Sequence, residues 1–207
     1  MSSRAKATET ISPYAAVLTG DATVYGLKAS AENSMRSVPA FAPGEKLVGS
    51  PGDDSLIGGI WDDSLSGGGG NDSLRGGDGS DWLWGGGDND YLDGGDGSDW
   101  QYGGDGNDTL MGGTGGDELE GQYGDDSIKG GDGNDAIYGG AGNDYLDGGA
   151  GNDTIYAGSR YISSDDNDTL IGGDGTDTAS YADDYAHYSV TTAGTETRIT
   201  DSNGNID

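Results

Sequence analysis

The sequence has no cysteine and a single histidine among its 207 residues. Without cysteine, disulfides and thiolate metal sites are excluded. The histidine, His187, stands beside Tyr185 and Tyr188 and has no second histidine with which to form a zinc site. The G-x-S-x-G motif of α/β-hydrolases is also absent. The sequence therefore predicts a surface histidine and no catalytic residues, so we expect a protein that is not an enzyme.

Apolar residues are scarce as well. They make up 31% of the chain, and phenylalanine occurs once, which excludes a wide hydrophobic core. The longest apolar run near the start, 14–18, is too short to span a membrane and lacks the order of a signal peptide. Composition of this kind usually indicates disorder, because little apolar burial is available to offset chain entropy.

Basic residues are few, and this restricts the partners. The chain has 9 Lys and Arg against 38 acidic residues, for a net charge of −29. This charge repels nucleic acids and anionic membranes, and it makes cations the natural partners. The acidic residues are 32 Asp and only 6 Glu. A preference for the shorter carboxylate favours tight turns, in which the side-chain oxygen lies close to its own backbone.

A nine-residue repeat fills the centre of the chain. Residues 103–111 read GGDGNDTLM, and the frame G-G-x-G-x-D-x-U-x, where U is aliphatic, runs twelve times from Gly49 to Tyr156 without insertion or deletion. A six-residue insertion around Arg160 follows, after which the frame resumes. Disordered low-complexity sequence has no reason to keep such a phase. The aspartates at position six are Asp54, Asp63, Asp72, Asp81, Asp90, Asp99, Asp108, Asp117, Asp126, Asp135, Asp144 and Asp153, followed by Asp168 and Asp177.

This repeat resembles the hemolysin-type, calcium-binding nonapeptide of the RTX (repeats-in-toxin) family over about two-thirds of the chain. The resemblance implies an all-β, right-handed parallel β-roll, in which six residues form a loop and three form a strand, with two nonapeptides per turn. It also implies multiple Ca²⁺ ions, each shared by loops eighteen residues apart, with the fourteen position-six aspartates as metal ligands in two columns. One column runs from Asp54 to Asp168 and the other from Asp63 to Asp177.

The residue types agree with calcium binding. Glycines at positions one, two and four are expected to allow positive φ and close stacking of loops. Inward carbonyl oxygens and the Asp carboxylate are the hard ligands that Ca²⁺ requires, whereas an EF-hand would need a twelve-residue loop closed by Glu. We expect weaker binding or altered geometry where the consensus glycine is replaced. These positions are Ser50, Trp61, Asp88, Gln122 and Ala157.

Calcium is expected to control folding. Position eight is Leu or Ile in eleven of the twelve repeats, the exception being Gln101. One large apolar side chain per nine residues offers too little burial to order the backbone securely. Carboxylates stacked near the strand spacing also repel one another. We therefore expect the array to be unfolded without calcium, so that binding the ion is folding.

The chain divides into three parts. Residues 1–48 are not repetitive, contain a short helix expected around 27–35, and either cap the first turn or remain flexible. Residues 49–180 form the predicted roll. Residues 181–207 are predicted to form a C-terminal β-hairpin cap, because β-branched residues alternate in 188–192 and 195–200 on either side of a turn. No apolar-ended tail is evident, which favours a truncated chain.

Aromatic residues gather on one face. Positions seven and nine of each strand point outward when position eight points inward. Trp82, Trp84, Trp100 and Tyr102 then share one sheet with Tyr138 and Tyr156, while Tyr91 and Tyr145 lie on the opposite sheet. Either these residues are ordinary strand formers that pair with their neighbours, or the first four form a partner face for a glycan, a cap segment or a second copy.

Two classes of function remain. The first is a secreted, non-catalytic calcium-binding protein that folds outside the cell and acts in adhesion, a surface layer, a matrix or self-assembly. The alternative is the calcium-dependent folding and secretion module of a larger secreted enzyme, such as a protease or lipase. The resemblance implies type I secretion from a bacterium, with an extracellular or cell-surface location.

Overall fold

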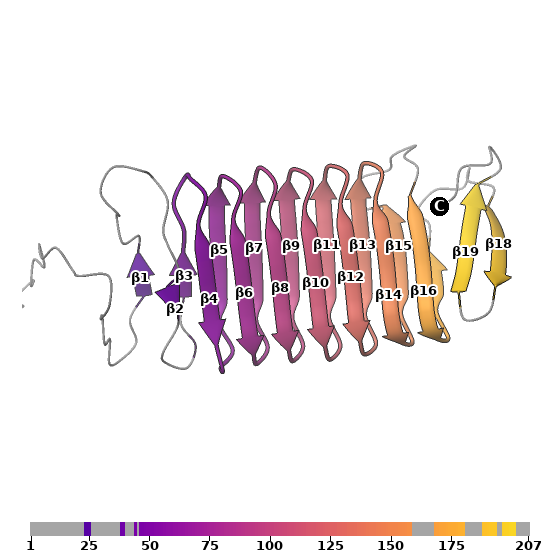
Figure 1. Cartoon of the computed structure of the whole chain (residues 1–207), viewed down its shortest axis with the longest axis horizontal. Coiled ribbons are helices and arrows are strands. Elements are labelled where there is room, and N and C mark those ends of the chain that lie inside the picture. The colour runs from indigo at the N-terminus through magenta and orange to yellow at the C-terminus, as the bar shows by residue number, and fades with distance from the viewer. Residues whose placement is uncertain are drawn as a thin grey trace, which may run out of the picture.

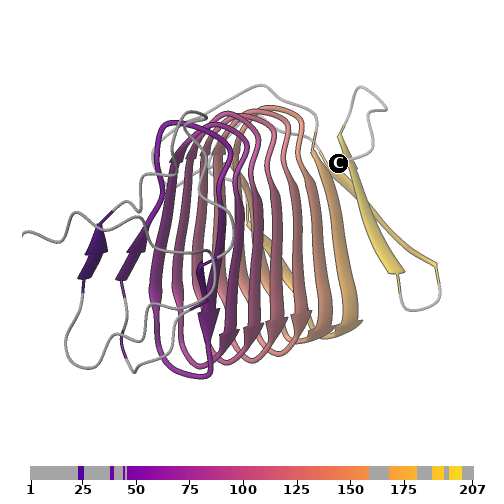
Figure 2. The ribbon, with the colours of Figure 1, turned by 60° about the vertical axis from the view of Figure 1, so that its left-hand side comes forward.

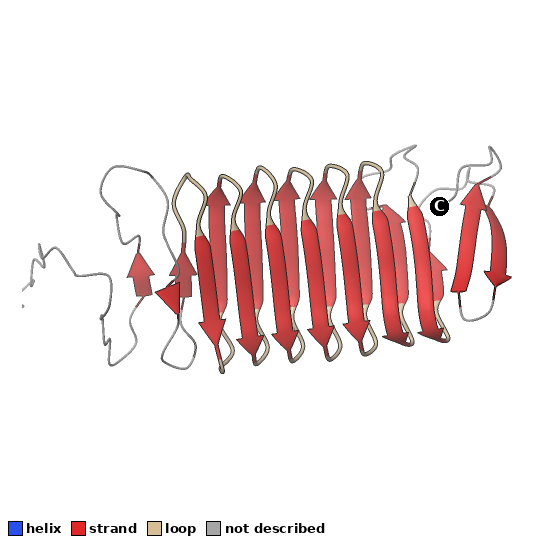
Figure 3. Ribbon diagram, viewed as in Figure 1, coloured by secondary structure: helices blue, strands red, loops and turns tan. Residues whose placement is uncertain are grey.

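The computed structural model of the chain describes residues 23–25, 38–39, 44, 46–158, 168–180, 188–193 and 196–201. All regular elements in these ranges are β-strands (Figure 3). Within the described part of the chain, no helix is long and apolar enough to cross a membrane. The helix expected around 27–35 and the predicted surface residue His187 lie outside the described residues.

The strands form two sheets, and consecutive strands of the roll alternate between them. The first sheet contains, in spatial order, β1 (Thr23–Tyr25), β3 (Lys46–Val48), β5 (Ser64–Gly69), β7 (Trp82–Gly87), β9 (Trp100–Asp105), β11 (Glu118–Tyr123), β13 (Ala136–Ala141), β15 (Thr154–Gly158) and β17 (Thr178–Ser180). The second contains β2 (Val38–Pro39), β4 (Ser55–Gly59), β6 (Ser73–Asp78), β8 (Tyr91–Asp96), β10 (Thr109–Thr114), β12 (Ser127–Asp132), β14 (Tyr145–Gly151), β16 (Thr169–Gly175), β19 (Glu196–Asp201) and β18 (Tyr188–Ala193).

Neighbouring strands of the roll are parallel and pair residues eighteen apart. Leu65 of β5 lies opposite Leu83 of β7, for example, and every described repeat up to 158 keeps this register. Each turn therefore uses two nonapeptides, one in each sheet. The turns stack along the long axis of the molecule, and the loops line its two long edges (Figures 1 and 2). The predicted parallel β-roll is confirmed.

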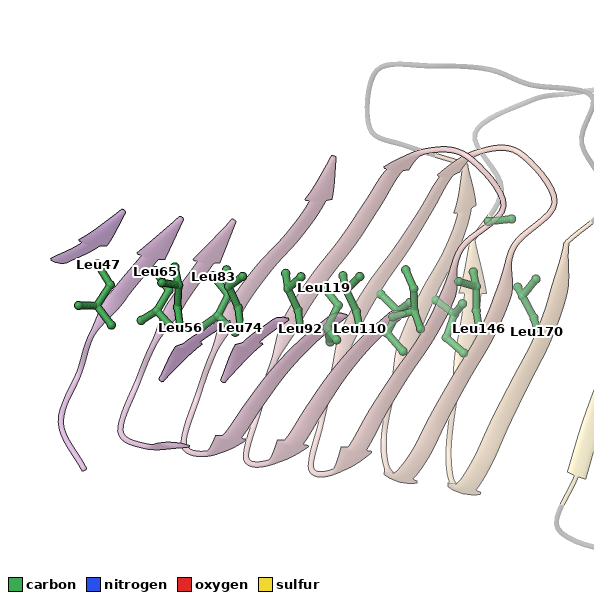
Figure 4. Packing of buried hydrophobic residues seen from close by; sticks show 14 residues of the cluster. Leu47, Leu56, Leu65, Leu74, Leu83, Leu92, Leu110, Leu119, Leu146 and Leu170 are labelled. Carbon is green, nitrogen blue, oxygen red and sulfur yellow. The ribbon is translucent and has the colours of Figure 1, made fainter. Parts of the chain in front are cut away.

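The core is one row of aliphatic side chains from each sheet. In β7, Leu83 is 1% exposed, whereas Trp82 and Trp84 on either side of it are exposed, as the two-residue period of a strand requires. The position-eight Leu and Ile side chains lie in a narrow file between the two sheets (Figure 4). Gln101, the exception at position eight, is also fully buried.

The predicted C-terminal hairpin is present. Strand β18 pairs antiparallel with β19, and β19 pairs antiparallel with β16 through Ile171 and Arg198. The hairpin therefore lies along the last parallel strand of the second sheet. Another chain cannot pair with the part of β16 that β19 covers, and β18 becomes the edge strand of this sheet.

Candidate metal centre

The aspartates at position six form two continuous hydrogen-bonded columns. The backbone N–H of each Asp donates to Oδ1 of the Asp one turn further on, as Asp90 does to Asp108 at 2.8 Å. Across the insertion, Asp144 donates in the same way to Asp168 at 2.9 Å. The first column is unbroken to Asp168 and the second to Asp177. The structure thus brings together all fourteen predicted aspartates in the two expected columns.

The second carboxylate oxygen, Oδ2, is buried and has no hydrogen-bond partner among the described residues in ten of these side chains. They are Asp72, Asp81, Asp90, Asp99, Asp108, Asp117, Asp126, Asp135, Asp144 and Asp153. Burying a polar atom without a partner costs free energy, and burying a charge costs more. A repeated, aligned set of such oxygens is what a row of cations would require.

Glycine at position one leaves room for this oxygen. A Cβ on Gly85 would overlap Oδ2 of Asp90 and the carbonyl oxygen of Gly103 in the next turn. Gly85 does not adopt a positive φ, so the expectation of positive φ at position one was wrong. The glycine is needed because two oxygens converge on the space that a side chain would fill.

Glycines at positions two and four turn their carbonyl oxygens toward the following turn. Gly95 and Gly97 have φ of 109° and 144°, and a Cβ on either would overlap the carbonyl oxygen of Gly77 or Gly79 in the turn before. Positive φ at these two positions is therefore needed for both the bend of the loop and the close stacking of turns.

The gap between two successive loops is consequently lined by oxygens. Between loops 76–81 and 94–99 these are the carbonyl oxygens of Gly77, Gly79 and Gly94, together with Oδ2 of Asp81. Within the described ranges, no three His, Cys, Asp or Glu side chains form a metal cluster, so main-chain carbonyls must supply most ligands of any ion. Neutral and anionic hard oxygens of this kind fit Ca²⁺, which takes six to eight oxygen ligands.

Burial raises the pKa of the ten column carboxyl groups whose Oδ2 has no hydrogen-bond partner within the described ranges. For Asp72 the backbone N–H of Asp54 opposes this effect, while the charges of Asp90 and Asp54 add to it. The pKa is raised to about 6 at Asp81, Asp99, Asp108 and Asp117, to about 7 at Asp72, Asp90, Asp126 and Asp135, and to about 8 at Asp144. Each value lies above the ordinary 3.8 because the charged form is desolvated and repelled.

Replacements of the consensus glycines alter the loops in different ways. Ser50 donates two hydrogen bonds to Oδ2 of Asp54, one from its N–H and one at 3.0 Å from its Oγ. The first loop therefore satisfies the oxygen that has no partner among the described residues in the ten aspartates from Asp72 to Asp153. Asp88 and Gln122 keep the positive φ of the glycines they replace, at 70° and 83°. A positive φ is unfavourable for a residue with a long side chain such as Gln.

The last two replacements differ again. Trp61 does not adopt a positive φ, and its side chain is 48% exposed on the loop before β5. Ala157 stands at position one, yet its methyl group belongs to the buried core. At the other position-one sites, the Asp five residues further on places its carboxylate where a side chain would lie. After Ala157 the next aspartate of the column is Asp168, because the insertion intervenes. Its carboxylate therefore does not stand five positions after Ala157.

A second ladder, at position five, was not predicted. The N–H of Asn107 donates to Oδ1 of Asn89 at 2.6 Å, and the N–H of Asp125 donates to Oδ1 of Asn107 at 3.0 Å. Hydrogen bonds from Asn143 to Asp125 lower the pKa of that exposed carboxyl group. The frequent Asn and Asp at position five carried the signal, because both side chains readily accept bonds from nearby backbone.

The aromatic residues lie where the repeat phase placed them. Trp82 of β7 stacks on Trp100 of β9 with ring centroids 5.0 Å apart, and Trp84 meets Tyr102 at 5.9 Å. Trp82 and Trp84 are 53% and 56% exposed. Further along the same sheet, the outward-pointing Tyr138 is only 6% exposed, so Tyr138 does not extend the exposed aromatic area.

The raised pKa values predict that acid favours the roll when calcium is absent. A carboxyl group with a pKa of about 6 to 8 in the roll and 3.8 in the unfolded chain binds its proton more tightly when folded. The ionised form of such a group destabilises the roll, and protonation removes this effect as the pH falls from about 8 to about 4. Circular dichroism in calcium-stripped buffer should show β-structure increasing over this range. A β-signal that decreases on acidification would contradict the prediction.

Comparison with known proteins agrees with this geometry. A family model for the RTX calcium-binding nonapeptide repeat, four copies long, matches residues 44–74, 66–101, 102–137, 129–159 and 162–181. No curated protein matches the chain. RTX repeats bind multiple Ca²⁺ ions, and the buried aspartate of each nonapeptide fits a calcium-binding turn. The matches cover more than half of the sequence, so the chain belongs to the RTX calcium-binding nonapeptide repeat family and is a calcium-binding protein.

Proposed function

We propose that this protein is a non-catalytic secreted module that folds when Ca²⁺ fills the gaps between its loops outside the cell. The observation that carries the proposal is the pair of continuous Asp columns with partnerless, buried Oδ2 atoms. The fourteen position-six aspartates would hold the ions together with the carbonyl oxygens of positions one, two and four. The ions would neutralise charges that otherwise oppose folding.

Electrostatics supports calcium as the switch for folding. Neighbouring carboxylates in each column raise one another's pKa, which means that their ionised forms repel across the turns. A cation in the gap reverses the sign of this interaction. Extracellular calcium modules work with dissociation constants in the range of about 10⁻⁴ to 10⁻³ M, so a chain of this type would stay unfolded during export and fold afterwards.

The first test is calcium-driven folding. The far-ultraviolet circular dichroism spectrum of the whole chain should change from coil-like with chelator at neutral pH to β-rich in millimolar Ca²⁺, since the oxygen-lined gaps close only around a cation. Calcium titration should show multiple ions, roughly ten per chain if most gaps are filled. Equally intense β-spectra with chelator and with calcium would rule the proposal out, and Mg²⁺ at the same concentration is the control ion.

Position in the column should decide the effect of losing a carboxylate. Asp108→Ala removes a partnerless Oδ2 as well as the acceptor for Asp90. Asp54→Ala is the matched control at the N-terminal end of the column, where Ser50 already satisfies Oδ2. We expect Asp108→Ala to raise the calcium concentration at half-folding several-fold more than Asp54→Ala, because an interior loop serves the gaps on both sides. Equal shifts would contradict ion sharing between turns.

The face formed by Trp82, Trp84, Trp100 and Tyr102 is the proposed partner face, and its geometry favours a neutral glycan. Trp82 stacks on Trp100 of the neighbouring strand β9, so one face of the Trp82 indole is turned toward Trp100. The opposite face is turned toward β5, the neighbour of β7 on its other side. There Ser64 and Ser66 lie opposite Trp82 and Trp84. Open indole faces beside small hydroxyl side chains suit a sugar ring, which has an apolar face and a hydroxyl rim. The charge of −29 disfavours polyanionic glycans.

The partner face is tested with the double variant Trp82→Ser/Trp100→Ser. Calcium-induced folding should be retained, because both rings lie outside the core, while binding to neutral glycans should be lost. Tyr145→Ser on the opposite sheet, where Tyr145 is 45% exposed, is the control and should bind normally. Unchanged glycan binding would remove this face from consideration. Loss of self-association instead, measured by sedimentation, would identify a second copy as the occupant.

The folding and secretion module of a larger enzyme is the second candidate function. The described residues consist of the parallel strands of the roll, with three short strands before residue 49, and a hairpin, an arrangement that suits a module joined to a catalytic domain as well as a protein acting alone. The intact mass of the native product decides between the two. A mass near 20.9 kDa supports the first proposal, whereas a larger mass with a catalytic domain supports the second.

A further inference from the structure

Gln101 is a buried amide in a file of aliphatic side chains. It stands on β9 between Leu83 of β7 and Leu119 of β11, and it is fully buried. An amide in an apolar core costs free energy unless hydrogen bonds compensate for its lost hydration. The position therefore calls for a polar partner within the roll.

The amide nitrogen of Gln101 reaches the oxygen-lined gap between loops 94–99 and 112–117. Nε2 donates to the carbonyl oxygen of Met111 at 2.6 Å, which fixes the orientation of the amide because a carbonyl can only accept. A Cβ on Gly94 would lie 2.7 Å from this nitrogen, beside Oδ2 of Asp99 and the carbonyl oxygen of Gly112. Oε1 of Gln101 has no hydrogen-bond partner in the described part of the chain.

The turns on either side show the unmodified arrangement. The three atoms nearest to a Cβ placed on Gly76 or on Gly112 belong to the Asp side chain of the same loop and to the carbonyl oxygen of the next position-one glycine. Leu83 and Leu119 occupy the core positions above those loops. The gap that follows loop 94–99 thus differs from both neighbouring gaps, because the side-chain donor Nε2 of Gln101 lies there beside the acceptor oxygens.

We propose that Gln101 weakens the cation site between loops 94–99 and 112–117 by placing an N–H donor where the neighbouring gaps on either side have carboxylate and carbonyl oxygens. The positive end of the amide repels a cation, and the hydrogen bond to Met111 holds it in place. The inference rests on the proposed role of Asp99 and its counterparts as ligands. It assigns the array a site that is modified from the core by a single residue, in addition to the loops whose consensus glycine is replaced.

The test compares site occupancies in crystals of the whole chain grown at limiting calcium. Anomalous scattering should show the gap after loop 94–99 less occupied than the gaps after loops 76–81 and 112–117, with an affinity about three- to tenfold weaker, the size of one competing hydrogen bond. Gln101→Leu should bring its occupancy up to that of its neighbours. In solution, calcium titration of the same variant should lose its weakest class of site.

Leu119→Gln is the matched control, because it places the same amide one turn further along the same sheet. It should lower occupancy in the gap after loop 112–117 and leave the gap after loop 76–81 unchanged. Equal occupancies in the natural chain, or no change in Gln101→Leu, would overturn the inference. A lower occupancy in Gln101→Leu would also overturn it, since Oε1 would then be a ligand. If every gap stayed empty in calcium, the proposed function itself would fail, and this inference with it.

Discussion

The accumulation of hydrogen-bond acceptors between the loops is the constraint on which the roll depends. Carbonyl oxygens from both loops and a carboxylate oxygen from one of them face the same gap. The backbone N–H groups nearby are already used by Oδ1 of the next Asp in the column. An ordinary protein avoids such an arrangement because partnerless buried acceptors are costly. Under the proposed function, ions in the gaps would supply the stability that the narrow aliphatic file alone does not.

Much of this arrangement follows from spacing in the sequence. The nine-residue period with one aliphatic residue and one Asp per repeat carried the resemblance to the RTX family, and that resemblance implied the parallel roll, the paired sheets and the membership of the two columns. The cross-strand pairing of Trp82 with Trp100 followed from the same phase. Once the resemblance gives two repeats per turn, these features depend only on period and register, which can be read from the sequence.

Other features depend on three-dimensional packing that spacing does not specify. The consensus shows that position one is glycine, but only the structure shows that the reason is space for Oδ2 rather than positive φ. The donation from Ser50 to Asp54 and the direction of the Gln101 amide depend on rotamers. The low exposure of Tyr138 likewise depends on its surroundings rather than on its outward position in the strand.

The hydrogen bonds of the Asp columns all run in one direction along the chain, and this gives the roll unequal ends. Each backbone N–H is satisfied by the carboxylate of the turn that follows it, as Asp108 is by Asp126. Shortening the array from its N-terminal side leaves every remaining N–H of the columns with its acceptor, but a strand N–H such as that of Ser73 loses the carbonyl oxygen of Asp54. Shortening it from the C-terminal side leaves buried N–H groups without acceptors. The two ends of a shortened roll therefore differ in kind: a new N-terminal end leaves strand N–H groups without acceptors, and a new C-terminal end leaves the N–H groups of the columns without theirs.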